Sequence, residues 1–222
     1  MNKVSDMIDQ FILVLVKVPS KALGSVSDLL NKLANPETSE DTLFTLKALL
    51  KGRVEIVKDK LLSFIGTVDI PETTDAFFGK KIFKKDSKEV RFYGFSNNFM
   101  NWFLKGEGLV EKPSIACKLR YTDITQDSLD DPIIEELGGK TEVRTTLSQI
   151  HSLLLKQPQG KKEGVLLTNG YANIFYVKDL EGELRAVYVR WDGGGWGVSA
   201  LSVGNPHAWF AGYRVFSAIL EA

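Results

Sequence analysis

The sequence predicts an α+β protein with a helical N-terminal region, a mixed middle and a C-terminal antiparallel β-meander packed against helices. Three observations support this prediction. Apolar residues recur at three- and four-residue steps through residues 1–65, which is the spacing of one helix face. Short runs rich in β-branched and aromatic residues begin near residue 66. After residue 160, strand-like runs alternate with turns rich in Gly and Asn, as in a meander of about five strands.

Length and composition are those of a folded globular protein. The chain has 222 residues, of which 44% are hydrophobic and 25% are charged. Lys plus Arg equals Asp plus Glu, at 28 each, so no net charge attracts the whole protein to nucleic acid or to acidic membranes. Turn residues at 106–108 and at Lys112-Pro113 indicate an internal boundary. We therefore expect a helical region over 1–65, a mixed segment over 66–112 and an α+β domain over 113–222.

The N-terminal region is predicted to consist of helices. The first ends at Pro19, which lacks a backbone N–H. Its apolar face comprises Val4, Ile8, Phe11, Leu15 and Val18. A second short helix is expected over 21–33, and Thr38 with Asp41 resembles a capping box that opens a third apolar-periodic stretch ending at Ile65. The apolar face of the first helix can pack on its own domain or on a second copy, which would make a homo-oligomer.

The middle of the chain mixes short strands with helices. Strands are expected over 67–70, 77–83, 90–93 and 115–121, and one or two helical turns over 97–105. Asp131 as N-cap, Pro132 at the first helical position and a Gly138-Gly139 stop predict a helix. Another helix is expected to start near Thr141. Its apolar face comprises Val143, Leu147, Ile150 and Leu154. These helices are expected to cover one face of the C-terminal sheet.

Turn signals define the C-terminal sheet. Asn169-Gly170, between 165–168 and 171–175, is a strong hairpin signal, since both turn positions need φ > 0. Further turns are expected at 179–182, 192–195 and 204–206, and strands at 184–191, 196–203 and 213–217. The glycine run at 193–195 precedes a strand pattern. We therefore interpret this run as a hairpin tip and not as a phosphate-binding loop.

No recognised catalytic or metal-binding motif occurs in the sequence. The histidines, His151 and His207, and the single cysteine, Cys117, lack metal-ligand spacing, so we expect neither a metal nor another cofactor. No serine lies in a GxSxG motif. Cys117 lies in a strand-like run, where it is expected to act as a small buried residue. A hydrolase that brings Cys117, a histidine or unpaired acids together only in the fold stays an alternative.

A basic segment provides a second alternative function. Residues 79–91 carry six basic and two acidic side chains, with aromatic residues among and after them. This combination suits a single-stranded nucleic acid contacted by Lys80, Lys81, Lys84 and Lys85. A solvated hairpin edge explains the same pattern, because lysines there oppose edge-to-edge strand pairing. The zero net charge favours the hairpin edge.

Aromatic residues concentrate beside the turns of the C-terminal sheet. The binding surface that we predict comprises Trp191, Trp196, Trp209, Tyr213 and Asn169. Rigid rings beside polar groups suit a ligand or partner surface, because they lose little conformational entropy on binding. Burial in the core is the other interpretation, and the sequence leaves both open. Our leading hypothesis is a non-enzymatic binding or assembly protein with a protein or small-ligand partner. Replacing Trp196 and Trp209 would then abolish partner capture without changing the circular dichroism spectrum.

The sequence predicts a cytoplasmic protein without a membrane span. A single cysteine allows no intrachain disulfide, which fits a reducing compartment. The apolar run at 11–16 is too short to span a bilayer, which needs about 20 residues. Asp6 and Asp9 before this run, and Pro19 after it, do not match a secretory signal.

The segments 110–124, 133–139, 166–179, 195–203 and 206–217 carry distinctive patterns. The last contains a tryptophan followed by G-x-R-V-F-S, at Trp209, Gly212, Arg214, Val215, Phe216 and Ser217. In these segments the chain resembles a group of uncharacterised proteins encoded in environmental bacterial genomes. The resemblance covers roughly residues 60–217 and implies a bacterial source. It implies no activity.

Overall fold

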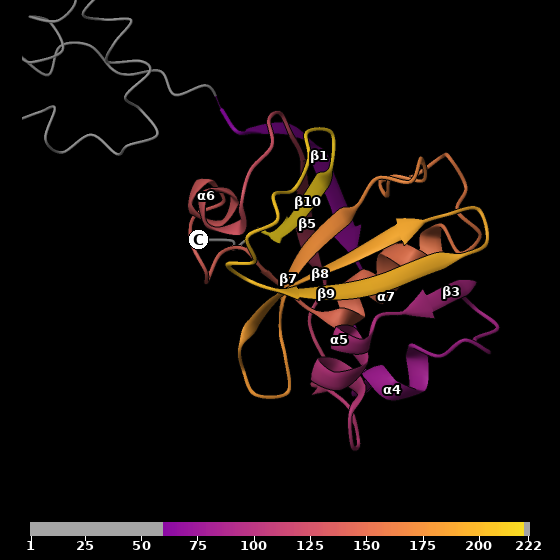
Figure 1. Ribbon diagram of the computed structural model, residues 1–222. Helices are drawn as coiled ribbons and strands as arrows, with labels where there is room; N and C mark the ends of the chain where they lie inside the picture. The colour runs from indigo at the N-terminus through magenta and orange to yellow at the C-terminus, as the bar shows by residue number, and fades with distance from the viewer. Residues whose placement is uncertain (1–59, 220–222) are drawn as a thin grey trace, which may run out of the picture. The chain divides into compact units, whose positions relative to one another are not determined.

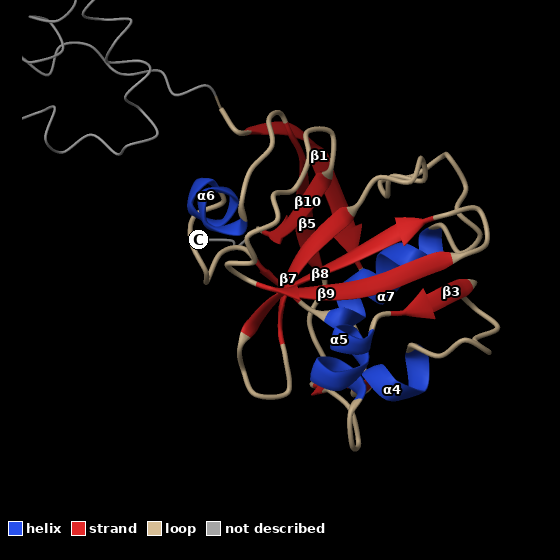
Figure 2. Cartoon of the chain, in the orientation of Figure 1, coloured by secondary structure: helices blue, strands red, loops and turns tan. Residues whose placement is uncertain are grey.

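A mixed sheet organises residues 60–219, the part of the chain that the computed structural model describes (Figures 1 and 2). The strand order is β1-β5-β10-β7-β8-β9-β3, and β6 also pairs with β7. The strands are β1 (Leu62–Ile70), β3 (Phe92–Phe95), β5 (Cys117–Ile124), β6 (Arg144–Thr145), β7 (Asn173–Lys178), β8 (Leu184–Trp191), β9 (Trp196–Ser202) and β10 (Arg214–Ala218). The combination of helices with this sheet confirms the predicted α+β class.

Only part of the sheet is a meander. β7, β8 and β9 pair antiparallel in chain order through the predicted turns at 179–182 and 192–195. β10 then pairs parallel with β7 and antiparallel with β5, so the last strand lies inside the sheet. β1 and β3 form the two edges, β1 antiparallel to β5 and β3 parallel to β9. Strands from 66–112 therefore pair directly with strands from 113–222.

The predicted hairpin at Asn169-Gly170 is wrong. A turn does form, because the Asn169 side chain accepts a hydrogen bond from the Tyr171 backbone N–H at 3.2 Å. The residues before it form no strand, however. The Asn173 side chain instead bonds the N–H of Leu167 at 2.8 Å and its carbonyl at 3.0 Å. A buried amide thus satisfies backbone groups that a strand ladder would otherwise use.

The helix expected from Thr141 starts later, as α7 (Leu147–Lys156). The Thr146 side chain accepts from the Gln149 N–H at 3.2 Å, and the Gln149 side chain accepts from the Thr146 N–H at 3.0 Å. This reciprocal capping box fixes the first turn, because it satisfies N–H groups that a helix start leaves without partners.

Other element boundaries also differ from the prediction. Residues 77–83, predicted as one strand, form β2 (Phe77–Phe78) and then α4 (Gly79–Ile82). Residues 62–65, expected at the end of a helix, belong to β1 and pair with β5. In α6 (Asp130–Glu136), Leu129 and not Asp131 occupies the N-cap position.

The predicted helical turns at 97–105 are confirmed. They form α5 (Asn97–Phe99), which continues as the π-helical η2 (Met100–Leu104). The Ser96 side chain caps α5 by accepting from the Phe99 N–H at 3.2 Å. β4 (Val110–Glu111) follows and pairs with β2.

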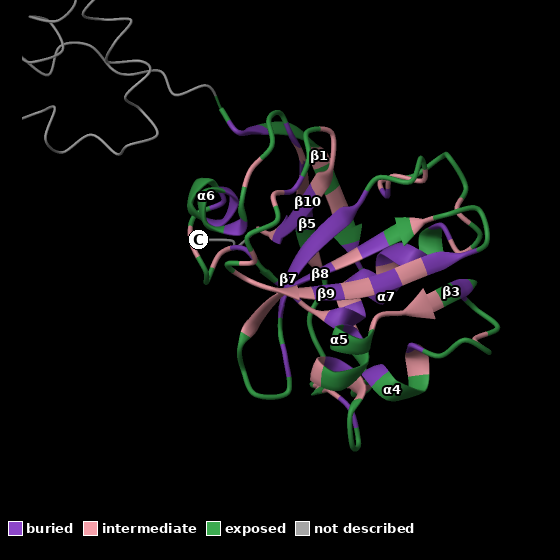
Figure 3. Cartoon of the chain, in the orientation of Figure 1, coloured by how far each residue is buried: buried purple, intermediate pink, exposed green. Residues whose placement is uncertain are grey.

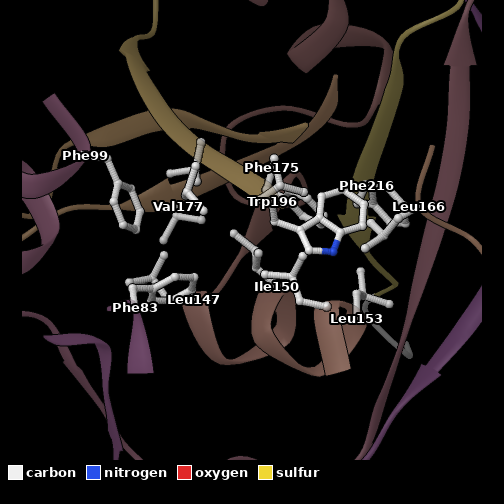
Figure 4. Packing of buried hydrophobic residues seen from close by; sticks show 14 of the residues in the cluster. Phe83, Phe99, Leu147, Ile150, Leu153, Leu166, Phe175, Val177, Trp196 and Phe216 are labelled. Atoms are coloured by element: carbon white, nitrogen blue, oxygen red, sulfur yellow. The ribbon is translucent and has the colours of Figure 1, made fainter. Parts of the chain in front are cut away.

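Helices cover both faces of the sheet, whereas the sequence interpretation placed them on one. Along β7, neighbouring residues point to opposite sides, and most of the strand is buried (Figure 3). One side packs against α7, and its cluster includes Phe175, Val177, Trp196, Ile150 and Leu153 (Figure 4). The other side packs against α6, and its cluster includes Ile174, Tyr176, Val215, Ile133 and Ile134.

The helices predicted over residues 1–59, with the Thr38 capping box and the homo-oligomer expected through the first helix, lie outside the described residues. Within residues 60–219, no helix has the length and apolar character needed to cross a membrane.

Candidate binding hollow

A small hollow lies on the α6 side of the sheet, where the segment 203–213 packs against β8 and β9. Its volume is about 140 Å³. The lining residues are Ala172, Tyr188, Arg190, Leu201, His207, Ala208, Trp209, Phe210 and Tyr213. Tyr188 and Arg190 point to this face because they alternate along β8 with the buried Val187 and Val189 of the opposite side.

Trp209 forms a fixed wall of the hollow. Its indole Nε1 donates to Asp130 Oδ1 at 2.7 Å, and the Tyr176 hydroxyl donates to the same oxygen at 2.8 Å. The backbone of Trp209 also exchanges two hydrogen bonds with Ser128, at 2.7 and 3.0 Å. Trp209 is 6% exposed and Asp130 is 2% exposed. The start of α6 and the sheet thus hold this ring in one orientation.

The buried Asp130 carboxyl has a perturbed pKa. Burial raises this pKa, while the hydrogen bonds from Trp209, Tyr176 and the Gly204 backbone oppose the rise. Burial also raises the pKa of Tyr176 well above 10.0, and the neighbouring Asp130 adds to that rise. The Tyr176 hydroxyl therefore stays a donor at neutral pH, as the arrangement requires.

A chain of ring contacts continues from Trp209 to the surface. The Trp209 ring lies 5.4 Å from that of Tyr188 and 6.3 Å from that of Tyr213, between ring centroids. Phe210 lies 5.7 Å from Tyr213 and is 56% exposed. The backbone turns here at Gly212, where φ is +86° and a Cβ would lie 2.8 Å from the Tyr171 ring. Glycine is therefore needed for this close packing.

Four of the five predicted binding residues form two separate pairs. Trp209 and Tyr213 line the hollow together. Trp191 and Trp196 pack against each other at 5.5 Å, and both belong to the opposite side of the sheet. Trp196 is 0% exposed, and its Nε1 donates to the Gln157 carbonyl at 2.8 Å, so its ring offers no surface to a partner (Figure 4). Asn169 is exposed in its turn.

The comparisons with known proteins find no relative. No family model, no curated protein and no solved structure matches this chain. The resemblance to uncharacterised bacterial proteins therefore stays a prediction.

The residues considered for nucleophilic catalysis have separate surroundings. Cys117 Sγ accepts from Gln149 Nε2 at 3.3 Å on β5. His151, on α7, packs against the rings of Phe77 and Phe83, and burial lowers its pKa. His207 lines the hollow on the other side of the sheet. No group of His, Cys, Asp and Glu side chains among residues 60–219 could hold a metal ion.

The lysines considered for nucleic-acid binding largely contact their own chain. Lys80 donates to the Gly106 carbonyl, Lys81 lies 4.1 Å above the Phe78 ring, and Lys84 pairs with Asp86 at 4.0 Å. Lys85 is exposed. These contacts do not test nucleic-acid binding, which stays a prediction.

Three depressions formed by the described residues are larger than this hollow. Two lie at the ends of α7, with volumes of about 510 and 580 Å³, and one of about 330 Å³ lies beside the C-terminal end of α6. Each of them is lined by a polar side chain that already bonds its own chain. In the first, the Glu111 carboxylate accepts from the backbone N–H groups of Leu147 and Ser148 at 2.7 and 2.8 Å, and it thus caps α7. In the second, Lys156 donates to the Asp69 carbonyl at 2.6 Å. In the smallest of the three, the Glu136 carboxylate accepts from the backbone N–H groups of Leu61 and Leu62, both at 3.0 Å. The smaller hollow instead combines partly exposed rings with Arg190, which has no ion-pair partner among residues 60–219.

Sequence reasoning missed Tyr188 and Arg190 as site residues. The alternation within 184–191 was a usable signal, since it separates these residues from Val187 and Val189. Which face of the sheet stays partly exposed at β8 depends on how α6 and the segment 203–213 pack, and no local sequence pattern predicts this packing.

Proposed function

We propose that this protein is a non-enzymatic binding protein and that the hollow receives one aromatic side chain of a partner protein. The observation that carries the proposal is the Trp209 ring, held beside Tyr188 and Tyr213 by its hydrogen bond to the buried Asp130. A ring that is fixed before binding loses little conformational entropy when a partner docks. Aromatic anchors in such hollows dominate the affinity of many protein interfaces.

The size of the hollow supports a side chain over a whole small ligand. Small-molecule sites usually enclose about 300–1,000 Å³ and cover most of the ligand. The hollow offers about 140 Å³, which suits a single ring. The partner class is therefore a protein segment that places one Phe, Tyr or Trp here.

A peptide titration tests this proposal. The probe is acetyl-Gly-Asn-Phe-Asn-Gly-amide, and acetyl-Gly-Asn-Ala-Asn-Gly-amide lacks the ring. With the full-length ¹⁵N-labelled protein, only the Phe peptide is expected to shift the amide resonances of residues 186–190 and 207–213 in a saturable way. Phe210→Ser is expected to weaken its binding about fivefold, because truncating a contacting ring removes about 1 kcal/mol of binding free energy.

Phe64→Ser is the matched control, because Phe64 is 65% exposed on β1, the strand at one edge of the sheet. It is expected to leave the affinity unchanged. Equal shifts with the Phe and Ala peptides, or no shift with either, would contradict the proposed function.

A further inference from the structure

We propose that the partner segment carries an acidic residue beside its ring and that Arg190 binds this carboxylate. The inference rests on the proposed function and names the chemistry of its partner. Arg190 is exposed at the rim of the hollow, on the same face of β8 as Tyr188. A ring seated against Tyr188 therefore places its neighbouring residues beside the guanidinium.

The strand next to Arg190 leaves room for such a carboxylate. Arg190 lies opposite Gly197 in the β8–β9 ladder. A side chain at this cross-strand position would cover the guanidinium or compete for it. At Gly197, an added Cβ would approach only the Arg190 carbonyl oxygen, at 3.7 Å, so the space above the glycine is open.

Arg190 also differs from most arginines of the described chain. Arg185 pairs with Asp179 at 2.7 Å, and Arg214 pairs with Asp123 at 2.7 Å. Arg120 and Arg144 donate to oxygen atoms of neighbouring residues. Within residues 60–219, no carboxylate lies within ion-pair distance of Arg190. Its charge is therefore available to a partner.

The charge of the lining favours an anion over a cation. No Asp or Glu occurs among the described residues that line the hollow. Asp130 lies behind Trp209, is 2% exposed and accepts hydrogen bonds from Trp209 and Tyr176. Aromatic rings alone would also attract a cation, but Arg190 repels one. A guanidinium can bind a carboxylate through two parallel N–H donors, so it fixes the orientation of the carboxylate as well as attracting it.

An isosteric peptide pair tests the inference. The acidic probe is acetyl-Gly-Asp-Phe-Asp-Gly-amide, and the neutral one is the Asn-Phe-Asn peptide. The wild-type protein is expected to bind the acidic peptide about two- to fivefold more tightly, which is the range for an exposed ion pair. This preference should shrink as salt is added. Arg190→Gln is expected to remove the preference for the acidic peptide over the neutral one, and Arg190→Lys to keep part of that preference.

Arg91→Gln is the matched control. Arg91 is an exposed arginine outside the hollow, so this variant changes the net charge equally and is expected to keep the preference. Equal binding of both peptides to the wild type would overturn the role of Arg190 and leave the proposed function standing. An unchanged preference in Arg190→Gln would do the same. Failure of the neutral Phe peptide to bind would instead contradict the proposed function itself.

Discussion

Replacing Trp196 by alanine is expected to lower the free energy of unfolding by about 3–5 kcal/mol. The Trp196 ring is 0% exposed and packs in the cluster between β9 and α7. The substitution removes its apolar contacts and leaves the Gln157 carbonyl without the indole donor at 2.8 Å. Urea denaturation followed by circular dichroism measures the loss as an earlier unfolding midpoint.

Two further variants separate the causes of that loss. Trp196→Phe keeps most of the packing and loses the hydrogen bond, so we expect a smaller decrease of about 1–2 kcal/mol. Trp191→Ala removes the same kind of side chain from the opposite strand, where it is partly exposed, and should also cost less than Trp196→Ala. A Trp196→Ala variant that unfolds at the wild-type urea concentration would show that the ring is not part of the core.

This expectation reverses the one drawn from the sequence for Trp196. The sequence hypothesis treated Trp196 and Trp209 as one surface and expected an unchanged circular dichroism spectrum after their replacement. The pattern Trp196, Val198, Ala200 already indicated a buried side of β9, since these residues alternate with Gly197 and Ser199. Because Trp196 also lies beside a turn, the sequence interpretation left both a buried and a surface position open for it.

Local signals predicted the local parts of the fold. The turns at 179–182 and 192–195 hold glycines with positive φ, and the strands between them alternate clearly, so β8 and β9 were predictable. The hairpin at Asn169-Gly170 failed because Asn173 bonds the backbone of Leu167. A single side chain that bonds these backbone groups in place of a neighbouring strand produces no periodic sequence pattern, so it could not be predicted.

Long-range pairings decided the rest. β10 lies between β5 and β7, and no short-range pattern specifies a parallel partner on one side and an antiparallel one on the other. The wall of the hollow depends on Asp130 and Trp209, which are 79 residues apart. Sequence reasoning named Trp209 but assigned the acids near Asp130 to the start of a helix. Their meeting required the complete fold.

Replacing Asp130 by alanine is expected to destabilise the protein by about 2–4 kcal/mol at pH 7. The change leaves two buried donors, the Tyr176 hydroxyl and the Trp209 indole, without their shared acceptor. Asp130→Asn retains an oxygen that can accept from both donors, and we expect it to cost about 1 kcal/mol. The alanine variant should also weaken binding of the Asn-Phe-Asn peptide at temperatures where it is still folded, because Trp209 is no longer held.

The pH dependence of stability gives the sharper test of this buried carboxyl. Burial raises the pKa of Asp130 in the folded state, whereas the unfolded chain has a value of about 3.9. Between these two values the folded state binds more protons than the unfolded state, so the free energy of unfolding falls as pH rises. The stabilisation from the protonated carboxyl is therefore complete below the unfolded pKa and is lost as pH rises through the folded one. Asp130→Asn cannot titrate, so the wild type should lose stability relative to this variant across that window.

Urea midpoints of wild type and Asp130→Asn, measured from pH 3 to pH 8, isolate this effect, because the other carboxyl groups contribute to both curves. Asp131→Asn controls for the removal of a charge at the start of α6, since Asp131 is exposed one residue along, and it should keep the wild-type trend. A difference between wild type and Asp130→Asn that grows in favour of the wild type as pH rises would mean that the bonds from Trp209 and Tyr176 outweigh burial. Asp130 would then hold the wall of the hollow as a stabilised anion. Its negative charge would weaken the attraction of Arg190 for an acidic partner.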